Sequence, residues 1–170
     1  PHPILTPEDL ERIRTAAHPD IVASEIDILF PAGGNGRDLE NALEDVFRKA
    51  EESIRGGISF IILTDRNMDA DHVPIPSLLA TSGLHHFLIR KKLRSSAGII
   101  VETGEAREAM HFAILIGYGA NAVCPHVAFS TVRALAETVY ERSVTPEEAT
   151  DSFITAIKKG KSPLVTAEEG

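Results

Sequence analysis

Residues 58–90, ISFIILTDRNMDADHVPIPSLLATSGLHHFLIR, decide the fold. The first part, residues 58–63, is a near-continuous apolar run, as expected of a parallel strand that is buried on both faces. An acidic elbow follows, and the segment ends on a predicted helix that carries two adjacent histidines, His85 and His86. A strand that passes through a polar turn into a helix is the repeating unit of parallel α/β sheets.

A similar unit precedes this segment. Residues 26–30, IDILF, predict a strand, and the glycine-rich loop 32–37, AGGNGR, follows it. This loop lacks the spacing of a nucleotide-binding motif, so a plain strand-to-helix connection is the better interpretation. Residues 39–54 then place apolar side chains at helical spacing, and Gly56 ends the predicted helix.

Two further units follow the segment. Residues 97–101 predict a strand, with Thr103 as a candidate N-cap of a helix over residues 105–116. Residues 122–124 predict a short fourth strand, followed by a helix over residues 126–141.

Two helices flank the four units. Thr6 and Thr145 are each followed by proline and by an acidic residue three positions later, which is the pattern of a capping box. The expected organisation is a single domain over residues 1–170. It has a helical lead-in at 1–25, βα repeats at 26–141 and a C-terminal helix at 145–160 that stops at Lys158-Lys159-Gly160.

Four successive βα units predict an α/β fold with a parallel sheet and right-handed crossovers. The sequence leaves two architectures open: a half-barrel, that is, an incomplete TIM-like barrel, or an open doubly wound sheet. In both, the carboxyl ends of the strands meet at one edge, and we expect any site at that edge.

Composition excludes several classes of function. The net charge of −8 argues against nucleic acid as a partner. No apolar run approaches the ~20 residues that span a bilayer, and no leader is recognisable, so we expect a cytoplasmic protein without a membrane partner. The basic residues Arg90, Lys91, Lys92 and Arg94 are interpreted as complementing the dipole of the preceding helix.

Carboxylates at the expected edge could bind a metal or act in acid–base chemistry. Asp65, Asp69 and Asp71 are oxygen ligands of the kind that Mg²⁺ or Ca²⁺ uses, but an acidic approach to a helix, with Asp65 paired to Arg66, is favoured. Glu102 and Glu105 flank a helix start, and they could form an acid–base pair only if they faced each other across a cleft.

Histidine and cysteine add weaker candidates. His85 and His86 point about 100° apart on a helix and cannot share one metal comfortably. We expect His86 to be a hydrogen-bonded histidine on the apolar, core-facing side of its helix. His111 and His126 show no metal-ligand spacing, and Cys124 is interpreted as a small buried side chain. No metal site is expected.

The segment 64–90 resembles the central domain of glutamate synthase, either the large subunit of the NADPH enzyme or the ferredoxin-dependent enzyme. Three more segments resemble this family in the same order, over about residues 1–160, and the chain resembles the C-terminal part of that central domain. They are PHPILTPEDLERI (1–13), SEIDILFPAGGNGRDLENALEDVFRKAEESI (24–54) and GIIVETGEAREAMHFAILIGYGANAVCPHVAF (98–129). Asn67, Met68 and Cys124 depart from the expected family residues and indicate a divergent member.

The resemblance implies a scaffold without a catalytic centre. In this family an amidotransferase domain releases ammonia from glutamine, and a domain with FMN and an iron–sulfur cluster completes glutamate synthesis from 2-oxoglutarate. The central domain joins the two, looks like an incomplete copy of the FMN barrel and helps to wall the ammonia passage. The resemblance therefore implies no cofactor in this chain. The partners that it implies are the amidotransferase and FMN-binding domains, in the same chain or as separate subunits. A homo-oligomer is a further expectation, because a half-barrel can complete its layer with another copy.

The candidate interface or passage residues lie at the expected sheet edge: Asp65, Arg66, Asp69, Glu102, Glu105, Arg107 and His126. Two other functions stay open. One is an independent half-barrel enzyme or metal-dependent lyase that uses Asp65, Arg66, Glu102 and His126. The other is a regulatory binding module derived from glutamate synthase.

Overall fold

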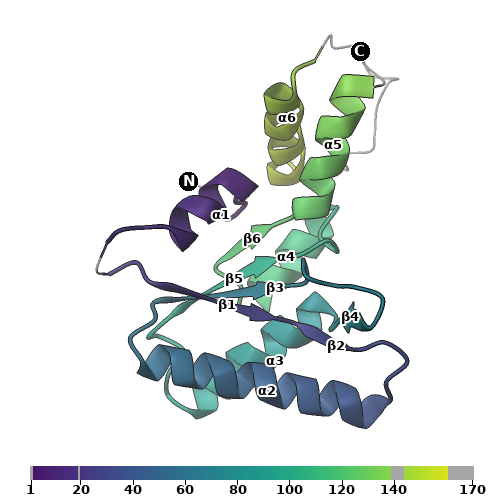
Figure 1. Ribbon diagram of the computed structural model, residues 1–170. Coiled ribbons are helices and arrows are strands. Elements are labelled where there is room, and N and C mark those ends of the chain that lie inside the picture. Colours follow the sequence, from purple (N-terminus) through teal and green to yellow (C-terminus); the bar gives the residue numbers. More distant parts are fainter. Residues whose placement is uncertain (1, 19, 139–143, 161–170) are drawn as a thin grey trace.

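The computed structural model describes residues 2–18, 20–138 and 144–160. Its main sheet has four parallel strands in the order β1-β3-β5-β6 (Figure 1). The strands are β1 (Ala23–Asp27), β2 (Leu29–Pro31), β3 (Phe60–Thr64), β4 (His72–Pro74), β5 (Gly98–Glu102) and β6 (Ala122–Cys124). The helices are α1 (Pro7–Arg14), α2 (Gly36–Arg55), α3 (Ser77–Arg90), α4 (Ala109–Gly117), α5 (His126–Thr138) and α6 (Pro146–Lys158).

The two faces of the sheet bury different elements, because successive strand side chains point to opposite sides. Ile61 and Leu63 of β3 join the large core with α2, α3 and α4. Ile62 faces the other way and packs with Leu10 of α1 in a second, smaller cluster. Figure 1 shows α1 on one side of the sheet, with α2 and α3 on the other. The crossover helices thus share one face, and α1 covers part of the opposite one.

The strand order favours one of the two predicted architectures. Neighbouring sheet strands follow one another along the chain, without the reversal of order that defines a doubly wound sheet. The α/β class and the parallel four-stranded sheet are confirmed, and the order is consistent with a half-barrel. None of the described helices is long and apolar enough to cross a membrane.

The first predicted strand is wrong in its extent. Residues 26–30 do not form one strand, because the chain changes partners at Ile28. The Ile28 N–H donates to the carbonyl of Thr64, and the Ile28 carbonyl accepts from the N–H of Ile75. Beyond this point β2 leaves the main sheet and pairs antiparallel with β4, which the sequence did not predict. A continuous apolar run does not show which strand each residue contacts.

Helix starts depend on local chemistry and were largely predicted. Thr6 and Thr145 both form complete capping boxes, and the last helix stops before Gly160 as expected. The predicted N-cap at Thr103 is wrong, since α4 begins only at Ala109, after Glu108. The predicted end of α5 beyond Thr138 lies outside the described residues.

The buried face of α3 also differs from the prediction. Ala80, Leu84 and Leu88 are fully buried, whereas Ile89 is 48% exposed and His86 is exposed. The expectation of His86 as a core histidine is therefore wrong. Because α3 is apolar around most of its circumference, helical spacing alone does not select the face that is buried.

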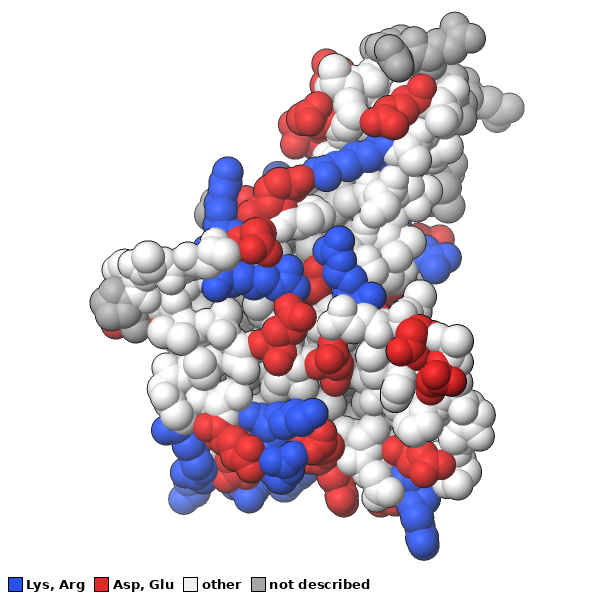
Figure 2. Space-filling model, viewed as in Figure 1, with Lys and Arg blue, Asp and Glu red and all other residues white. Residues whose placement is uncertain are grey.

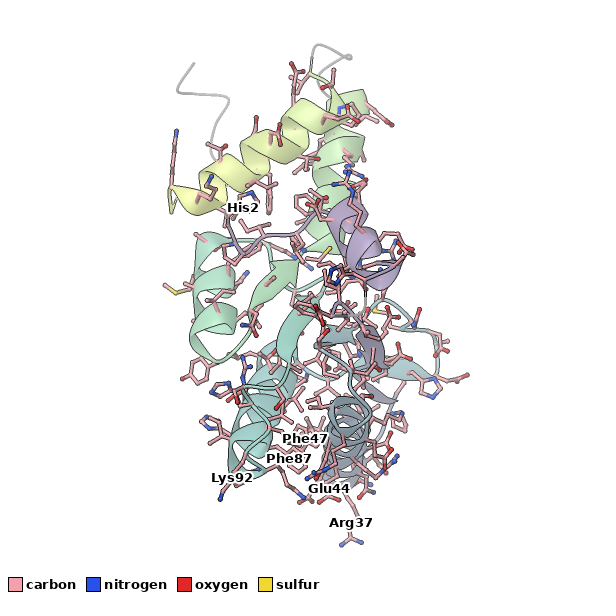
Figure 3. The ribbon with its side chains drawn as sticks, turned by 90° about the vertical axis from the view of Figure 1, so that its left-hand side faces the viewer. His2, Arg37, Glu44, Phe47, Phe87 and Lys92 are labelled. Atoms are coloured by element: carbon pink, nitrogen blue, oxygen red, sulfur yellow. The ribbon has the colours of Figure 1, made fainter. Side chains whose placement is uncertain are left out.

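Packing against α2 helps to select the buried face of α3. A Cβ atom added at Gly83 would lie 2.6 Å from Cζ of Phe47 on α2. The missing side chain therefore lets the two helices approach closely. Phe47 also stacks on Phe87 of α3, with ring centroids 5.3 Å apart, and the two residues lie side by side in Figure 3.

Arg94 joins loops, a role that the sequence did not predict for this member of the basic cluster. Its Nε donates to Nδ1 of His85 at 2.9 Å. Its terminal nitrogens donate to the carbonyls of Ala97 and Gly119 and to the side chain of Asn121. Arg94 thus ties the end of α3 to the loops before β5 and β6.

This contact predicts a pH dependence. Burial and the nearby cation of Arg94 hold the pKa of His85 below its usual value. The unfolded chain therefore binds a proton at His85 more readily than the folded chain. As pH falls from about 7 through the unfolded pKa of about 6.5, the free energy of unfolding should decrease. Thermal melts at pH 7.5 and 5.5 should show this loss, and His85→Gln, which keeps an acceptor for Arg94, should reduce it.

Candidate functional site

The carboxyl ends of the strands meet at one edge, as the parallel arrangement requires. In the sheet register, Thr64 of β3 lies opposite Glu102 of β5, and Glu102 lies opposite Cys124 of β6. Asp65 follows Thr64 directly, and His126 begins α5 two residues after Cys124. Two carboxylates and a histidine that are far apart in sequence are thereby brought together.

Asp65 is buried at the centre of this edge. Its carboxylate accepts hydrogen bonds from Oγ1 of Thr103 at 2.6 Å and from the N–H of Gly104 at 2.9 Å. Its other oxygen lies 2.7 Å from Nε2 of His126. Burial alone would raise the pKa of Asp65, but the hydrogen bonds from His126, Thr103 and Gly104 outweigh it and lower the pKa. Asp65 is thus an ionised group that joins the loops after β3, β5 and β6.

Glu102 is a second buried carboxylate, fully shielded from solvent. It accepts hydrogen bonds from Nη2 of Arg14 and Oγ1 of Thr64, both at 2.7 Å, and from Nη1 of Arg66 at 3.2 Å. Burial alone would raise the pKa of Glu102, but these three partners outweigh it and lower the pKa. Arg14 also pairs with Glu25 of β1. Glu102 therefore clamps α1 onto the sheet.

The sequence did not predict the role of Arg14. It lies 88 positions from Glu102 along the chain, and a basic residue in the last turn of a helix is equally well explained by the helix dipole. One signal in the sequence could have indicated a partner for Glu102. A glutamate at the end of a buried strand needs a cationic partner, because a buried carboxylate is stable only when it is paired.

An open hollow of about 440 Å³ lies between α1 and this edge. It is lined by Pro7, Glu8, Glu11, Arg12, Arg14, Thr15 and Arg66. Acidic and basic side chains alternate over this face in Figure 2. The mixed charge does not favour a ligand of either sign.

Glu105 does not face Glu102 but caps another helix. Its Oε2 accepts a hydrogen bond from the N–H of Ser77, the first residue of α3, at 2.8 Å. Pro76 holds the N-cap position, where its side chain has no polar group to cap the helix. Glu105 therefore supplies the cap from the neighbouring βα unit.

Replacing Glu105 with alanine should lower the free energy of unfolding by about 1 kcal/mol, the usual contribution of an N-cap side chain. Urea denaturation would measure the change. Glu44→Ala, at an exposed position inside α2, tests whether the effect is specific to capping. Equal losses in the two variants would contradict the capping role.

The remaining candidate residues of the edge, Asp69 and Arg107, bind residues that are close to them in sequence. Asp69 is 58% exposed and binds His72 and the backbone N–H of Asp71. Nε of Arg107 donates to the carbonyl of Gly104 at 3.3 Å. Within residues 2–18, 20–138 and 144–160, no three His, Cys, Asp or Glu side chains are arranged to hold a metal ion.

Cys124 is buried, as predicted for a small core side chain. Burial, together with the negative charge of Glu102, raises the pKa of its thiol to about 12. A thiol with this pKa is protonated at neutral pH and is a poor nucleophile.

Fold and edge together define a parallel α/β domain of half-barrel type, in which the edge carboxylates hold loops in place. The profile of the glutamate synthase central domain matches residues 1–164. The chain belongs to the glutamate synthase central domain family.

The chain is similar to segments of several glutamate synthases. The NADPH glutamate synthase large chain of Bacillus subtilis is 48% identical over 131 residues, which are 77% of this chain and 8% of that protein. The NADH glutamate synthase of Schizosaccharomyces pombe is 34% identical over 163 residues, 94% of this chain and 8% of that protein. The chain thus spans about a twelfth of the length of these relatives.

Among solved structures, an L230A mutant of flavocytochrome b2 with benzoylformate resembles the chain with a TM-score of 0.54. The identity is 13%, and the match covers 91% of this chain and 36% of that one. This likeness shows the fold alone.

Proposed function

We propose that this domain is a non-catalytic scaffold of glutamate synthase. It joins the amidotransferase and FMN-binding parts of the enzyme and forms part of the wall of the ammonia passage between them. Family membership supports the setting, and the bonding at the sheet edge supports the scaffold role. FMN and the iron–sulfur cluster belong to other parts of that enzyme in this proposal.

The observation that carries the proposal is that the buried carboxylates are fully engaged in hydrogen bonds within the domain. Asp65 holds the loops after three strands, and Glu102 holds α1 to the sheet. Among the described residues, every buried polar side-chain atom has a hydrogen-bond partner. Groups that are fully bonded inside the domain fix its shape, whereas an acid or base in catalysis must reach a substrate.

The same geometry divides the candidate residues into two sets. The first set, Asp65, Glu102 and His126, holds the edge together. These side chains are shielded from solvent, and each is paired with a residue of another strand or loop at the edge. Arg66, whose side chain is 55% exposed, and Asp69 at 58% reach the surface of the edge. Arg107 is exposed as well. We propose these three for contact with neighbouring domains or with the passage.

The experiment compares two routes to glutamate in a glutamate synthase that carries this domain. Arg66→Ala should lower glutamine-dependent synthesis relative to ammonia-dependent synthesis, because ammonia escapes when the passage wall is altered. Lys49→Ala, at an exposed position on α2, serves as the control. An unchanged ratio in Arg66→Ala would contradict the passage role.

The isolated chain gives the second test. Purified alone, it should show neither the absorbance of flavin nor glutaminase activity, and its mass in solution reports whether it forms a homo-oligomer. Bound flavin would contradict the scaffold proposal. An independent half-barrel enzyme would instead bind a divalent metal or a sugar phosphate at the edge, and this binding would be lost on His126→Asn.

A further inference from the structure

The outer face of α4 lacks charge. Residues 109–132 contain no Lys, Arg, Asp or Glu. Met110 is 66% exposed, and Ala113 and Gly117, three and seven positions further along, are exposed beside it. A helix that is apolar on all sides is typical of a position with protein on every side. In this domain the inner side packs against the core through Phe112, while the described residues leave the outer side exposed.

A groove continues this face toward α3, which lies next to α4 in Figures 1 and 3. The groove has a volume of about 210 Å³, and its apolar lining comes from Leu78, Ala106, Ile114 and Leu115. Pockets for small molecules usually measure about 300–1,000 Å³. The groove is therefore suited to one large apolar side chain rather than to a small-molecule ligand.

One end of the groove is polar and acidic. Ser77, Glu105 and His111 line it there. Nδ1 of His111 already accepts from the backbone N–H groups of Arg107 and Glu108. Glu105 uses Oε2 for Ser77, and its carboxylate brings a negative charge to the groove. A fitting partner inserts an apolar side chain and places a cation or N–H donor near Glu105.

A second copy of this domain does not meet that requirement well. In a symmetric dimer each face meets an identical face. Because α4 has no Lys or Arg, it would bring no cation to the copy's Glu105. The chain spans only 8% of the length of the Bacillus subtilis relative, so most of such a polypeptide lies outside this domain and is available to cover the face.

We propose that the α3–α4 groove and the outer face of α4 form a contact with another domain of the glutamate synthase polypeptide, which inserts an apolar side chain beside a basic residue. This rests on the proposed scaffold function. It adds a second contact surface, on the helical side of the sheet, which meets the carboxyl edge at Glu105.

Methionine oxidation tests this contact and the carboxyl-edge contact separately. The chain has two methionines, Met110 on α4 and Met68 in the loop after β3, and they are 66% and 60% exposed in this domain. Hydrogen peroxide should oxidise both at similar rates in the 170-residue chain. In an intact glutamate synthase that carries the domain, Met110 should be oxidised at least ten-fold more slowly, as measured by peptide mass spectrometry.

The outcomes separate the two proposals. Unchanged oxidation of Met110 in the intact enzyme overturns the groove contact. If only Met68 is oxidised slowly there, the carboxyl-edge contact is supported and the groove contact is overturned. Protection of Met110 in the isolated chain that rises with concentration assigns the face to a second copy and also overturns the proposal.

A substitution gives a second measurement. Met110→Glu places a charge on a face that is exposed in the isolated chain, so its melting temperature there should change little. In the intact enzyme the same charge would be buried at the contact, and the melting temperature should fall by several degrees. Ile21→Glu, 36% exposed and ahead of β1, is the matched control. Equal effects of Met110→Glu in both settings would overturn the contact.

Discussion

Replacing Glu102 with alanine should lower the free energy of unfolding by about 2–4 kcal/mol, the largest loss that we expect from a single substitution at the sheet edge. The change leaves the guanidinium groups of Arg14 and Arg66 beside an empty acceptor site. It also removes the acceptor of the buried Thr64 hydroxyl. Both arginines are partly exposed and can regain water, which keeps the expected loss below that of a fully buried ion pair.

Urea denaturation of the chain measures this loss. Glu102→Gln keeps the shape and one acceptor, so it should cost less than alanine, about 1–3 kcal/mol. Glu52→Ala is the control, because Glu52 pairs with Arg48 on the solvent side of α2 and such pairs contribute less than about 1 kcal/mol. A loss at Glu102 no larger than that at Glu52 would show that the clamp on α1 contributes little.

Replacing Asp65 with alanine should lower the free energy of unfolding by about 2–3 kcal/mol, because buried donors that lose their acceptor pay their full desolvation cost. The Thr103 hydroxyl and the Gly104 N–H both lose their partner, and His126 loses its carboxylate. Hydrogen exchange should rise first in the loops after β5 and β6, which Asp65 holds together.

Asp65→Asn separates the charge from the shape. Its carbonyl oxygen can still accept from Thr103 or Gly104, but its amide group cannot accept and replaces one carboxylate oxygen. We expect about half the loss seen with alanine. Asp27→Ala, at the exposed end of β1, is the control. Equal stability of Asp65→Asn and the unsubstituted chain would mean that the charge of Asp65 is unimportant.

The two carboxylates also predict an acid limit to stability. Their pKa values are lowered in the folded chain, so the unfolded chain binds protons more readily in acid. Their contribution is complete above the unfolded values, about 4, and is lost as pH falls through the lowered folded values. This window lies below that of His85. The acid midpoint of unfolding should therefore lie at higher pH in Glu102→Ala and in Asp65→Ala than in the unsubstituted chain.

Some of this fold was accessible from sequence because the signals are local. The apolar run over residues 58–63 predicted a buried strand, and β3 forms there. Capping boxes at Thr6 and Thr145 involve only neighbouring residues, and both formed as predicted. The gathering of Asp65, Glu102 and His126 at one edge followed from the rule that parallel strands end on the same side.

Other features depend on partners that are remote in sequence. Gly83 lies against Phe47, and this contact helps to set the face of α3 that is buried, so that His86 is exposed instead of packed. Thr103 has the chemistry of an N-cap, and its hydroxyl accepts from the N–H of Glu105 while it donates to Asp65, yet α4 starts only six residues later, at Ala109. In the case of α3 a tertiary contact selected the buried face, and in the case of Thr103 the local capping bond formed without starting a helix.

The sequence by itself determined the kind of chain this is: βα units, a parallel sheet, capped flanking helices and the motifs of the glutamate synthase central domain. Periodicity, caps and motifs are properties of neighbouring residues, so they can be recognised without coordinates. Only the tertiary structure showed that Glu102 binds Arg14 and that a mainly apolar groove with an acidic end opens between α3 and α4. The reason is physical, because a carboxylate's partner and a helix's exposed face depend on which distant elements pack against them.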